Sequence, residues 1–376
     1  MSSVPTLGEV TSLLEGWFPP ERADEWDAVG LVCGDPDAEV RRILLAVDPV
    51  TAVAEEALES GAQLVVTHHP LLLKGVHGVG ATTPKGRVVH RLIQGGCGLF
   101  AAHTNADSPA GGVSESLALA LGLQDPRPLE RDPGAPLDKI VVFVPVEAAA
   151  EVRDALTRAG AGRIGAYDQA SFSSTGTGRF RPLEGAAPAV GEVGRSEEVE
   201  EARVETVAPR HLRDEVIAAV RAAHPHEEPA FDVVELARLE DATRGSGRVG
   251  ELAREMTLRD FASLVDQVLP ATAHGVRVAG DPDQRVQTVA VCGGAGDFLL
   301  DRVRALGVDV YLTSDLRHHP ASELREHGAP ALVDVSHWAA ESTWLPVLHR
   351  RLAGALGDTV DLRVSTICTD PWTFRV

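Results

Sequence analysis

Short apolar runs that are rich in valine and end in polar residues constrain the fold of this chain more than any other feature. The clearest run, Leu64-Val65-Val66, leads through Thr67 into His68, His69 and Pro70. A short continuous run of this kind predicts a buried parallel strand, and the proline ends its ladder pairing. Open α/β sheets place ligands and catalytic groups at such strand ends, so the two imidazoles mark a candidate site. A turn that merely contains two histidines is the alternative.

Strands of this type alternate with helical segments at both ends of the chain. In the first part we expect strands at 42–47, 64–66 and 98–102 and helices at 7–19, 50–60, 84–94 and 112–119. In the last part we expect strands at 275–279, 287–292, 308–313 and 331–335 and helices at 257–268 and 339–355. Alternation of strands and helices is typical of α/β folds. The two parts are therefore predicted to form one open-sheet α/β domain.

A different pattern interrupts this domain. The run at 125–138 is rich in proline and charge and predicts a boundary. Beyond it we expect strands at 139–145, 202–207 and 231–236, helices at 147–159 and 209–223, and hairpins or loops within 160–195. The order β-α-β-β-α-β predicts an inserted ferredoxin-like α+β domain. The expected organisation is residues 1–130, an insertion at 131–245, and residues 246–376.

Composition narrows the class of protein. A chain of 376 residues is long enough for two domains with a real core. A net charge of −20 argues against nucleic acid or an anionic membrane as the partner. No apolar stretch has the length of a membrane span, and the N-terminus lacks a signal-peptide pattern. The four scattered cysteines predict reduced thiols, so we expect a cytoplasmic protein.

Potential metal ligands recur at four predicted strand ends. They are His68 with His69, His103 with Asp107, Asp315 with His319, and His337 with Glu341. Taken singly, Asp107 could cap a helix, His103 could donate a hydrogen bond in a turn, and an i, i+4 pair such as His337 and Glu341 occurs on many helices. Taken together, they predict one site, because an open sheet gathers the carboxyl ends of its parallel strands on one rim.

The ligand types restrict the metal. Mixed nitrogen and oxygen ligands suit Zn, Mn, Fe, Co or Ni, and they suit Ca and Mg poorly. The side chains outnumber those that one tetrahedral ion with an open position needs, whereas two ions about 3.5–4 Å apart would use them all. We therefore expect two divalent metal ions per subunit, with their identity left open.

Two further motifs have a structural alternative. Gly293-Gly294-Ala295-Gly296 follows a strand and could bind phosphate through its N–H groups, but a plain tight turn fits the spacing better. The run His224-Pro225-His226-Glu227-Glu228-Pro229 could be a ligand cluster, yet its prolines favour a structural or interface role.

Several segments resemble the NIF-three-like dinuclear metal-centre proteins, which are commonly named GTP cyclohydrolase 1 type 2 homologues. The segments are WDAVGLVCGD (26–35), VVTHHPLLLKG (65–75), HTNADSPAGGVSESLALALGL (103–123), VAVCGGAGDFLL (289–300), YLTSDLRHHPASEL (311–324) and ALVDVSHWAAES (331–342). They run in order through both outer parts of the chain. The middle part, with PHEEPAFDV at 225–233, resembles the PII/CutA-like insertion of the longer bacterial members.

The resemblance implies a set of site residues and an assembly. It implies that two metal ions are held by His68, His69, Asp107, His337 and Glu341. It also implies that His319, Asp315 and His103 line the same cavity. The family further implies a homohexamer whose sites face an internal cavity.

Two functions fit these expectations. The first is a dinuclear metal-dependent hydrolase that acts on a small nucleotide or phosphate-ester-like substrate, with His319 or His103 moving the proton. The second is a non-catalytic, metal-binding hexamer that regulates or binds a partner and senses a ligand through its insert. Turnover that is lost with a chelator and returns with metal distinguishes the first from the second.

Overall fold

The computed structural model describes residues 4–376, which form two compact units. Unit 1 combines the chain up to Asp132 with Asp241–Val376, and unit 2 is Pro133–Glu240. None of the helices formed by residues 4–376 has the length and apolar character of a membrane span.

The first sheet of unit 1 is built mainly from the N-terminal part of the chain. Its strands are β1 (Gly30–Cys33), β2 (Arg42–Ala46), β3 (Leu64–Thr67), β4 (Gly98–Ala101) and β15 (Asp361–Val364). They lie in the order β1-β4-β3-β2-β15, and all neighbours are parallel except β1 and β4. The associated helices are α1 (Leu7–Trp17), α2 (Thr51–Ser60), α3 (Pro84–Gln94) and α12 (Leu345–Leu356).

The central strand β3 is buried on both faces, as its apolar run predicts. Leu64 and Val66 pack on one face with residues of α1 and α12. Val65 packs on the opposite face with residues of α2 and α3. The histidines that follow β3 are therefore held by a rigid, fully covered strand.

The second sheet of unit 1 is built mainly from the C-terminal part. Its strands are β5 (Leu123–Pro133), β10 (Glu240–Thr257), β11 (Arg277–Ala279), β12 (Arg285–Ala295), β13 (Val310–Ser314) and β14 (Ala331–Val335). Their order is β11-β14-β13-β12-β10-β5, with β12, β13 and β14 parallel to one another. Its helices include α5 (Val113–Ala120), α8 (Leu258–Val268), α9 (Leu300–Leu306), α10 (His318–Glu326) and α11 (His337–Ser342).

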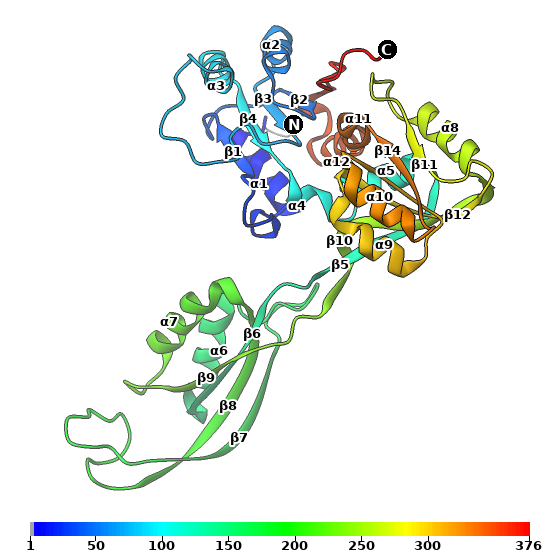
Figure 1. Cartoon of the computed structure of the whole chain (residues 1–376). Coiled ribbons are helices and arrows are strands. Elements are labelled where there is room, and N and C mark those ends of the chain that lie inside the picture. Colours follow the sequence, from blue (N-terminus) through cyan, green and yellow to red (C-terminus); the bar gives the residue numbers. More distant parts are fainter. Residues whose placement is uncertain (1–3) are drawn as a thin grey trace. The chain divides into compact units, whose positions relative to one another are not determined.

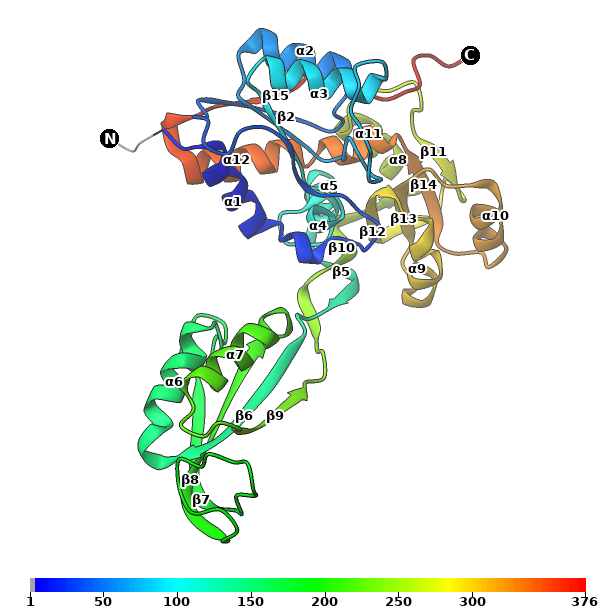
Figure 2. The same ribbon diagram turned by 90° about the vertical axis from the view of Figure 1, so that its left-hand side faces the viewer.

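Helices α5, α11 and α12 lie between the two sheets (Figures 1 and 2). Val113 at the start of α5 packs with the core of the first sheet, and Leu117 one turn later packs with the core of the second. Trp338 on α11 contacts both cores. This helical layer faces strand ends from both halves of the chain.

The α/β class is confirmed, but unit 1 contains two sheets where we expected one open sheet. Strand β15 pairs with β2, although most of the sequence lies between them. A pattern in the local sequence cannot predict such a distant pairing. The run at 125–138, expected to be a boundary, begins as β5, an edge strand whose position tolerates prolines. The single helix expected at 339–355 is broken into α11 and α12, with Trp344 between them and Pro346 in the first turn of α12.

Unit 2 has one four-stranded sheet. Its elements are β6 (Leu137–Pro145), α6 (Ala149–Arg158), β7 (Ser171–Phe180), β8 (Glu197–Pro209), α7 (Arg213–Ala223) and β9 (Ala230–Glu235). The strand order is β7-β8-β6-β9, and every pair is antiparallel. Both helices cover the same face of this sheet (Figures 1 and 2) and share one apolar core with it. The likeness of this unit to PII and CutA proteins stays a prediction.

We expect unit 1 to fold without unit 2, because the chain leaves and re-enters unit 1 through adjacent strands. Strands β5 and β10 are neighbours, and the Gly134 N–H donates to the Leu239 carbonyl oxygen at 2.6 Å. Replacing residues 134–239 by an Asn-Gly hairpin turn should therefore leave a protein that unfolds cooperatively. Circular dichroism with a thermal scan checks this, with the full chain as the reference. A deletion variant that is unfolded where the full chain is stable would contradict the expectation.

Candidate metal centre

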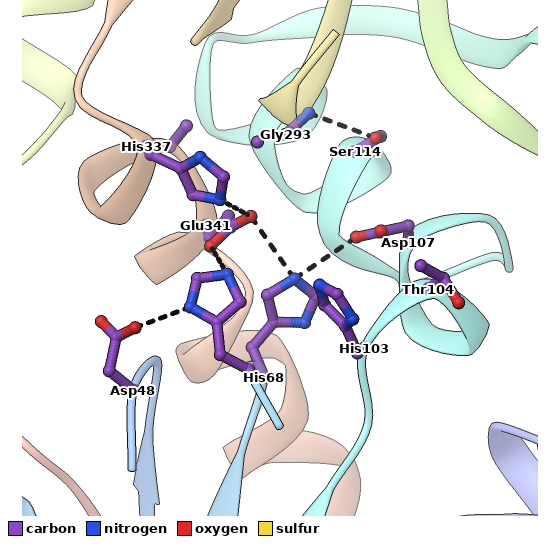
Figure 3. A network of polar contacts seen from close by, with 12 residues as sticks. Asp48, His68, His103, Thr104, Asp107, Ser114, Gly293, His337 and Glu341 are labelled. Atoms are coloured by element: carbon purple, nitrogen blue, oxygen red, sulfur yellow. Dashed lines mark hydrogen bonds and ion pairs between the residues drawn. The ribbon is translucent and has the colours of Figure 1, made fainter. Parts of the chain in front are cut away.

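Strand ends and helices of unit 1 bring four histidines and two acids together (Figure 3). His68 and His69 follow β3, and His103 follows β4. Asp107 ends the short helix α4 (Thr104–Asp107), and α11 supplies His337 and Glu341. The sheets therefore contribute through the carboxyl ends of their strands, as the sequence predicts.

Both histidines of the consecutive pair face the cluster. The His69 N–H donates to the Val47 carbonyl oxygen at 2.9 Å, which keeps the chain beside β2 just past the end of β3. The two imidazole centroids are 5.0 Å apart, with the ring planes tilted by 41°. His68 is fully buried, and its ring lies 5.6 Å from the ring of buried Trp344. The chain thus departs from the strict alternation of a strand, which would send the two rings to opposite sides.

The Nδ1 atom of each of the four histidines has a fixed hydrogen-bond partner. The pairs are His68 with the Ala102 carbonyl oxygen (2.9 Å), His69 with Asp48 (2.7 Å), His103 with Asp27 (2.8 Å) and His337 with Asp315 (2.7 Å). Each partner is an acceptor, so Nδ1 carries the proton in every pair. This arrangement orients the ring and leaves Nε2 for another ligand, as is usual for metal-bound histidines.

Glu341 lies at the centre of the cluster, and its side chain is only 3% exposed. Its Oε1 is 2.8 Å from His337 Nε2 and 3.4 Å from His68 Nε2, and its Oε2 is 3.0 Å from His69 Nε2. Asp107 Oδ1 lies 3.5 Å from the same His68 Nε2 atom. One carboxylate therefore reaches three imidazoles (Figure 3).

The cluster fits a metal ion on the chemistry of its own atoms. Three buried atoms, His68 Nε2, Asp107 Oδ1 and Glu341 Oε2, have no hydrogen-bond partner among residues 4–376. Buried polar atoms are almost always paired, so each of these needs an explanation. Two ligands that bind one ion tetrahedrally at about 2.1 Å lie about 3.4 Å apart, close to the separations found here. The atoms therefore have the spacing of ligands around a cation and lack the alignment of mutual hydrogen bonds.

Two groups of three residues meet the spacing for a metal ion, and they share His69. One group is His68, His69 and His103, and the other is His69, His337 and Glu341. Within each group the ligand atoms lie within 4.8 Å of one another. The cluster is therefore wider than a single triad.

The electrostatics of the cluster follow from burial and from the close carboxylates. Burial lowers the pKa of His69, but the close charge of Glu341 and the hydrogen bond of Asp48 outweigh it and raise the pKa to about 11. Burial also lowers the pKa of His337, but the charge of Glu341 and the hydrogen bond of Asp315 outweigh it and raise the pKa to about 10. Burial raises the pKa of Glu341, yet the three imidazolium charges hold it well below its usual range. Protons on the imidazoles must leave before a metal ion binds.

The structure brings most of the expected site residues together. Asp107 does not cap α5, whose N-cap is Gly112, and it faces His68. Asp315 has a φ of +57°, which is uncommon for a residue with a side chain, and its carboxylate contacts His337. His319 is exposed on α10 and its ring contacts that of His318, and within residues 4–376 no hydrogen bond or ion pair joins it to the cluster.

Sequence reasoning missed Asp48 and Asp27 as partners of the histidines. Asp48 follows the strand expected at 42–47, so the rule that selected His68 could also have found it. Asp27 offered no such signal, because it reaches His103 from a loop 76 residues earlier.

The glycines near the end of β12, where its pairing with β13 shifts register, pack against the cluster. Gly294 has a φ of +71°, and a Cβ on it would lie 2.7 Å from Glu341 Oε1 and 3.3 Å from His337 Nε2. The Thr313 hydroxyl donates to the Gly294 carbonyl oxygen at 3.0 Å and fixes this end of the strand. The glycine is therefore required both by its backbone conformation and by the close approach to Glu341.

Comparisons with known proteins agree on one family. The model of the Duf34/NIF3 (NGG1p interacting factor 3) family matches residues 5–371. A Mycobacterium tuberculosis protein named GTP cyclohydrolase 1 type 2 homolog is 51% identical over 367 residues, which cover 97% of this chain and 96% of that protein. A Bacillus subtilis protein of the same name is 38% identical over 369 residues, which cover 97% of this chain and 98% of that protein.

Solved structures show the same fold. A Bacillus cereus protein related to NIF3 superimposes with a TM-score of 0.77 at 38% identity, and both chains are covered completely. A Staphylococcus aureus protein gives a TM-score of 0.81 at 28% identity, again with complete coverage of both chains.

We expect Asp48→Asn to weaken metal binding about 10–100-fold, because an amide can donate as well as accept and no longer fixes the proton on His69 Nδ1. Competition with a chelating dye, using Zn²⁺ or Mn²⁺, measures the affinity. Asp37→Asn is the matched control, since Asp37 is exposed and outside the cluster. Equal affinities of the two variants would show that Asp48 does not support the metal ligand.

Proposed function

The chain belongs to the Duf34/NIF3 family, and on that premise we propose that it is a dinuclear metal-dependent hydrolase acting on a nucleotide or phosphate-ester-like small molecule. The observation that carries the proposal is the shared orientation of four histidines, each fixed through Nδ1 beside two acids. The name GTP cyclohydrolase 1 type 2 homolog, borne by the relatives, supports a nucleotide as the substrate class.

The residues divide naturally between two positions. We assign His69, His337 and Glu341 to one ion, and His68 and Asp107 with the same glutamate to the other. The nitrogen and oxygen donors suit Zn, Mn, Fe, Co or Ni. Two such ions, when bound, would supply a water of lowered pKa and polarise the electrophilic centre of the substrate.

His103 is the better of the two expected proton-transfer residues. Its ring lies 5.1 Å from that of His68 and 5.5 Å from that of His69, whereas the one ring that His319 contacts is that of exposed His318 among residues 4–376. Its Nδ1 donates to Asp27. Burial raises the pKa of Asp27, but the hydrogen bonds from His103 and Thr104 outweigh it and hold this pKa far below its usual range. A permanently charged Asp27 orients the imidazole and leaves Nε2 to accept or deliver a proton.

We expect Glu341→Gln to remove at least one of two metal ions per subunit. The substitution keeps the volume of the side chain but removes the charge that three imidazoles surround, and it leaves one oxygen where there were two. Elemental analysis of the folded protein gives the ratio of metal to subunit. Glu323→Gln, on the exposed face of α10, is the matched control. Full occupancy in Glu341→Gln would exclude that carboxylate as a ligand.

Metal dependence of turnover tests the hydrolase itself. The metal-loaded chain should hydrolyse members of a panel of nucleotides and phosphate esters. This activity should be lost after chelation and should return when metal is added back. Tight metal binding without turnover of any compound would instead favour the alternative, a non-catalytic regulatory assembly. The same assay with His103→Gln should show slower turnover at unchanged metal content if His103 moves the proton.

We also propose that the chain assembles as a homohexamer, which rests on the family resemblance alone. Static light scattering at micromolar concentration should then give six times the 39.8 kDa mass of the chain. A mass equal to that of one chain would contradict the assembly.

A further inference from the structure

We propose that the segment from Thr369 to Arg375 recognises the substrate, with Trp372 stacking on a planar heteroaromatic ring and Arg375 binding an anionic group on the same molecule. The inference rests on the proposed function in one respect, because it places the ligand beside the metal cluster. It adds two specificity-determining residues that lie outside the cluster.

The segment is anchored to the groups that orient two of the histidines. It follows β15, and the Ser365 N–H donates to the Leu45 carbonyl oxygen of β2 at 2.8 Å. The Thr369 hydroxyl then donates to Asp48, the partner of His69. The Ser336 hydroxyl donates to Asp370, and Ser336 directly precedes His337. Side-chain hydrogen bonds therefore tie the segment to the partner of His69 and to the residue before His337.

A cavity of about 280 Å³ separates this segment from the cluster. Its walls include His69 and His337 on the cluster side and Trp338 and Trp372 as aromatic surfaces. A second cavity of about 470 Å³ shares Trp372 and Asp315 with the first and is lined further out by Phe374 and Arg375. The two cavities are therefore adjacent, the inner one lined by imidazoles of the cluster and the outer one by the Arg375 guanidinium group.

Trp372 presents an exposed aromatic ring on an anchored backbone. Its backbone N–H donates to Asp370 Oδ1 at 2.8 Å, while the residue is 68% exposed. A large aromatic ring exposed on a fixed backbone loses little conformational freedom when a planar ring stacks on it. The stacking surface lies within the cavity that His69 and His337 line.

The charges around the two cavities favour an anion in the outer one. The carboxylates of Asp48, Asp315 and Asp370 near the cluster already accept hydrogen bonds from protein groups. Arg277 at the outer cavity is paired with Asp334. Arg375 differs, because within residues 4–376 it forms no hydrogen bond or ion pair. An unpaired guanidinium beside aromatic rings suits a phosphate or carboxylate bidentately.

Binding of two small probes to the metal-loaded full chain tests the inference. Isothermal titration calorimetry with guanosine and with guanosine monophosphate separates the ring from the anion. Trp372→Leu should weaken both probes about tenfold, since stacking on an aromatic side chain contributes about 1–3 kcal/mol per base. Arg375→Gln should weaken guanosine monophosphate about tenfold and leave guanosine unchanged.

Matched controls are available on exposed surfaces elsewhere in unit 1. Phe298→Leu and Arg254→Gln alter an aromatic residue and an arginine that line neither cavity, and both should bind the probes as the unaltered chain does. Unchanged binding in Trp372→Leu and Arg375→Gln, or no binding of guanosine monophosphate to the unaltered chain at millimolar concentration, would overturn the inference.

Metal content and turnover, measured on the same samples, keep this inference apart from the proposed hydrolase. Loss of probe binding in the two variants at unchanged metal content supports the recognition segment. A chain that binds metal and hydrolyses a substrate with equal efficiency in all variants retains the hydrolase and overturns the segment. A chain that binds the probes through Trp372 and Arg375 but never turns over a substrate would support the recognition segment and contradict the hydrolase.

Discussion

The buried carboxylate of Glu341 is the constraint on which the site depends. A charge that is 3% exposed is costly unless opposite charges or cations surround it, and three imidazole nitrogens approach it within 3.4 Å. Those nitrogens come from the end of β3 and from α11, so satisfying one carboxylate requires both sheets of unit 1 to be in place. Gly294 lets the end of β12 approach the same carboxylate, because a side chain at that position would collide with it. The cluster therefore ties the folding of the two halves to the geometry of the site.

The division of unit 1 into two sheets explains how the chain tolerates an insertion. Each sheet has its own parallel core, and the insertion leaves unit 1 through β5 and returns through β10, on the edge of the second sheet that is remote from β14 and His337. An edge strand can extend outward without disturbing the parallel strands that carry the ligands. The residues that orient the histidines, Asp48, Asp27 and Asp315, all belong to unit 1.

Much of the site was predictable from the sequence because the ends of the strands could be located from the apolar runs. The apolar run before His68 and the helical spacing of His337 and Glu341 each specify a local geometry, and an α/β fold converts these into proximity. The number of sheets was not predictable, since β15 finds β2 through a pairing that only the finished fold defines. Asp27 was equally hidden, as its role depends on a loop meeting His103 from 76 positions away. His319 is exposed on α10, and its expected role at the cavity stays a prediction.

Asp48 links the orientation of His69 to the C-terminal segment. One of its oxygens accepts the His69 Nδ1 proton, and the other accepts the Thr369 hydroxyl at the start of the C-terminal segment. Any movement of that segment must therefore alter either the hydrogen bond of Thr369 or the position of the carboxylate that fixes His69. Asp370 repeats the arrangement beside His337 through Ser336. Asp48 thus couples a wall of the cavity directly to one imidazole, and Asp370 ties the same wall to the residue that precedes another.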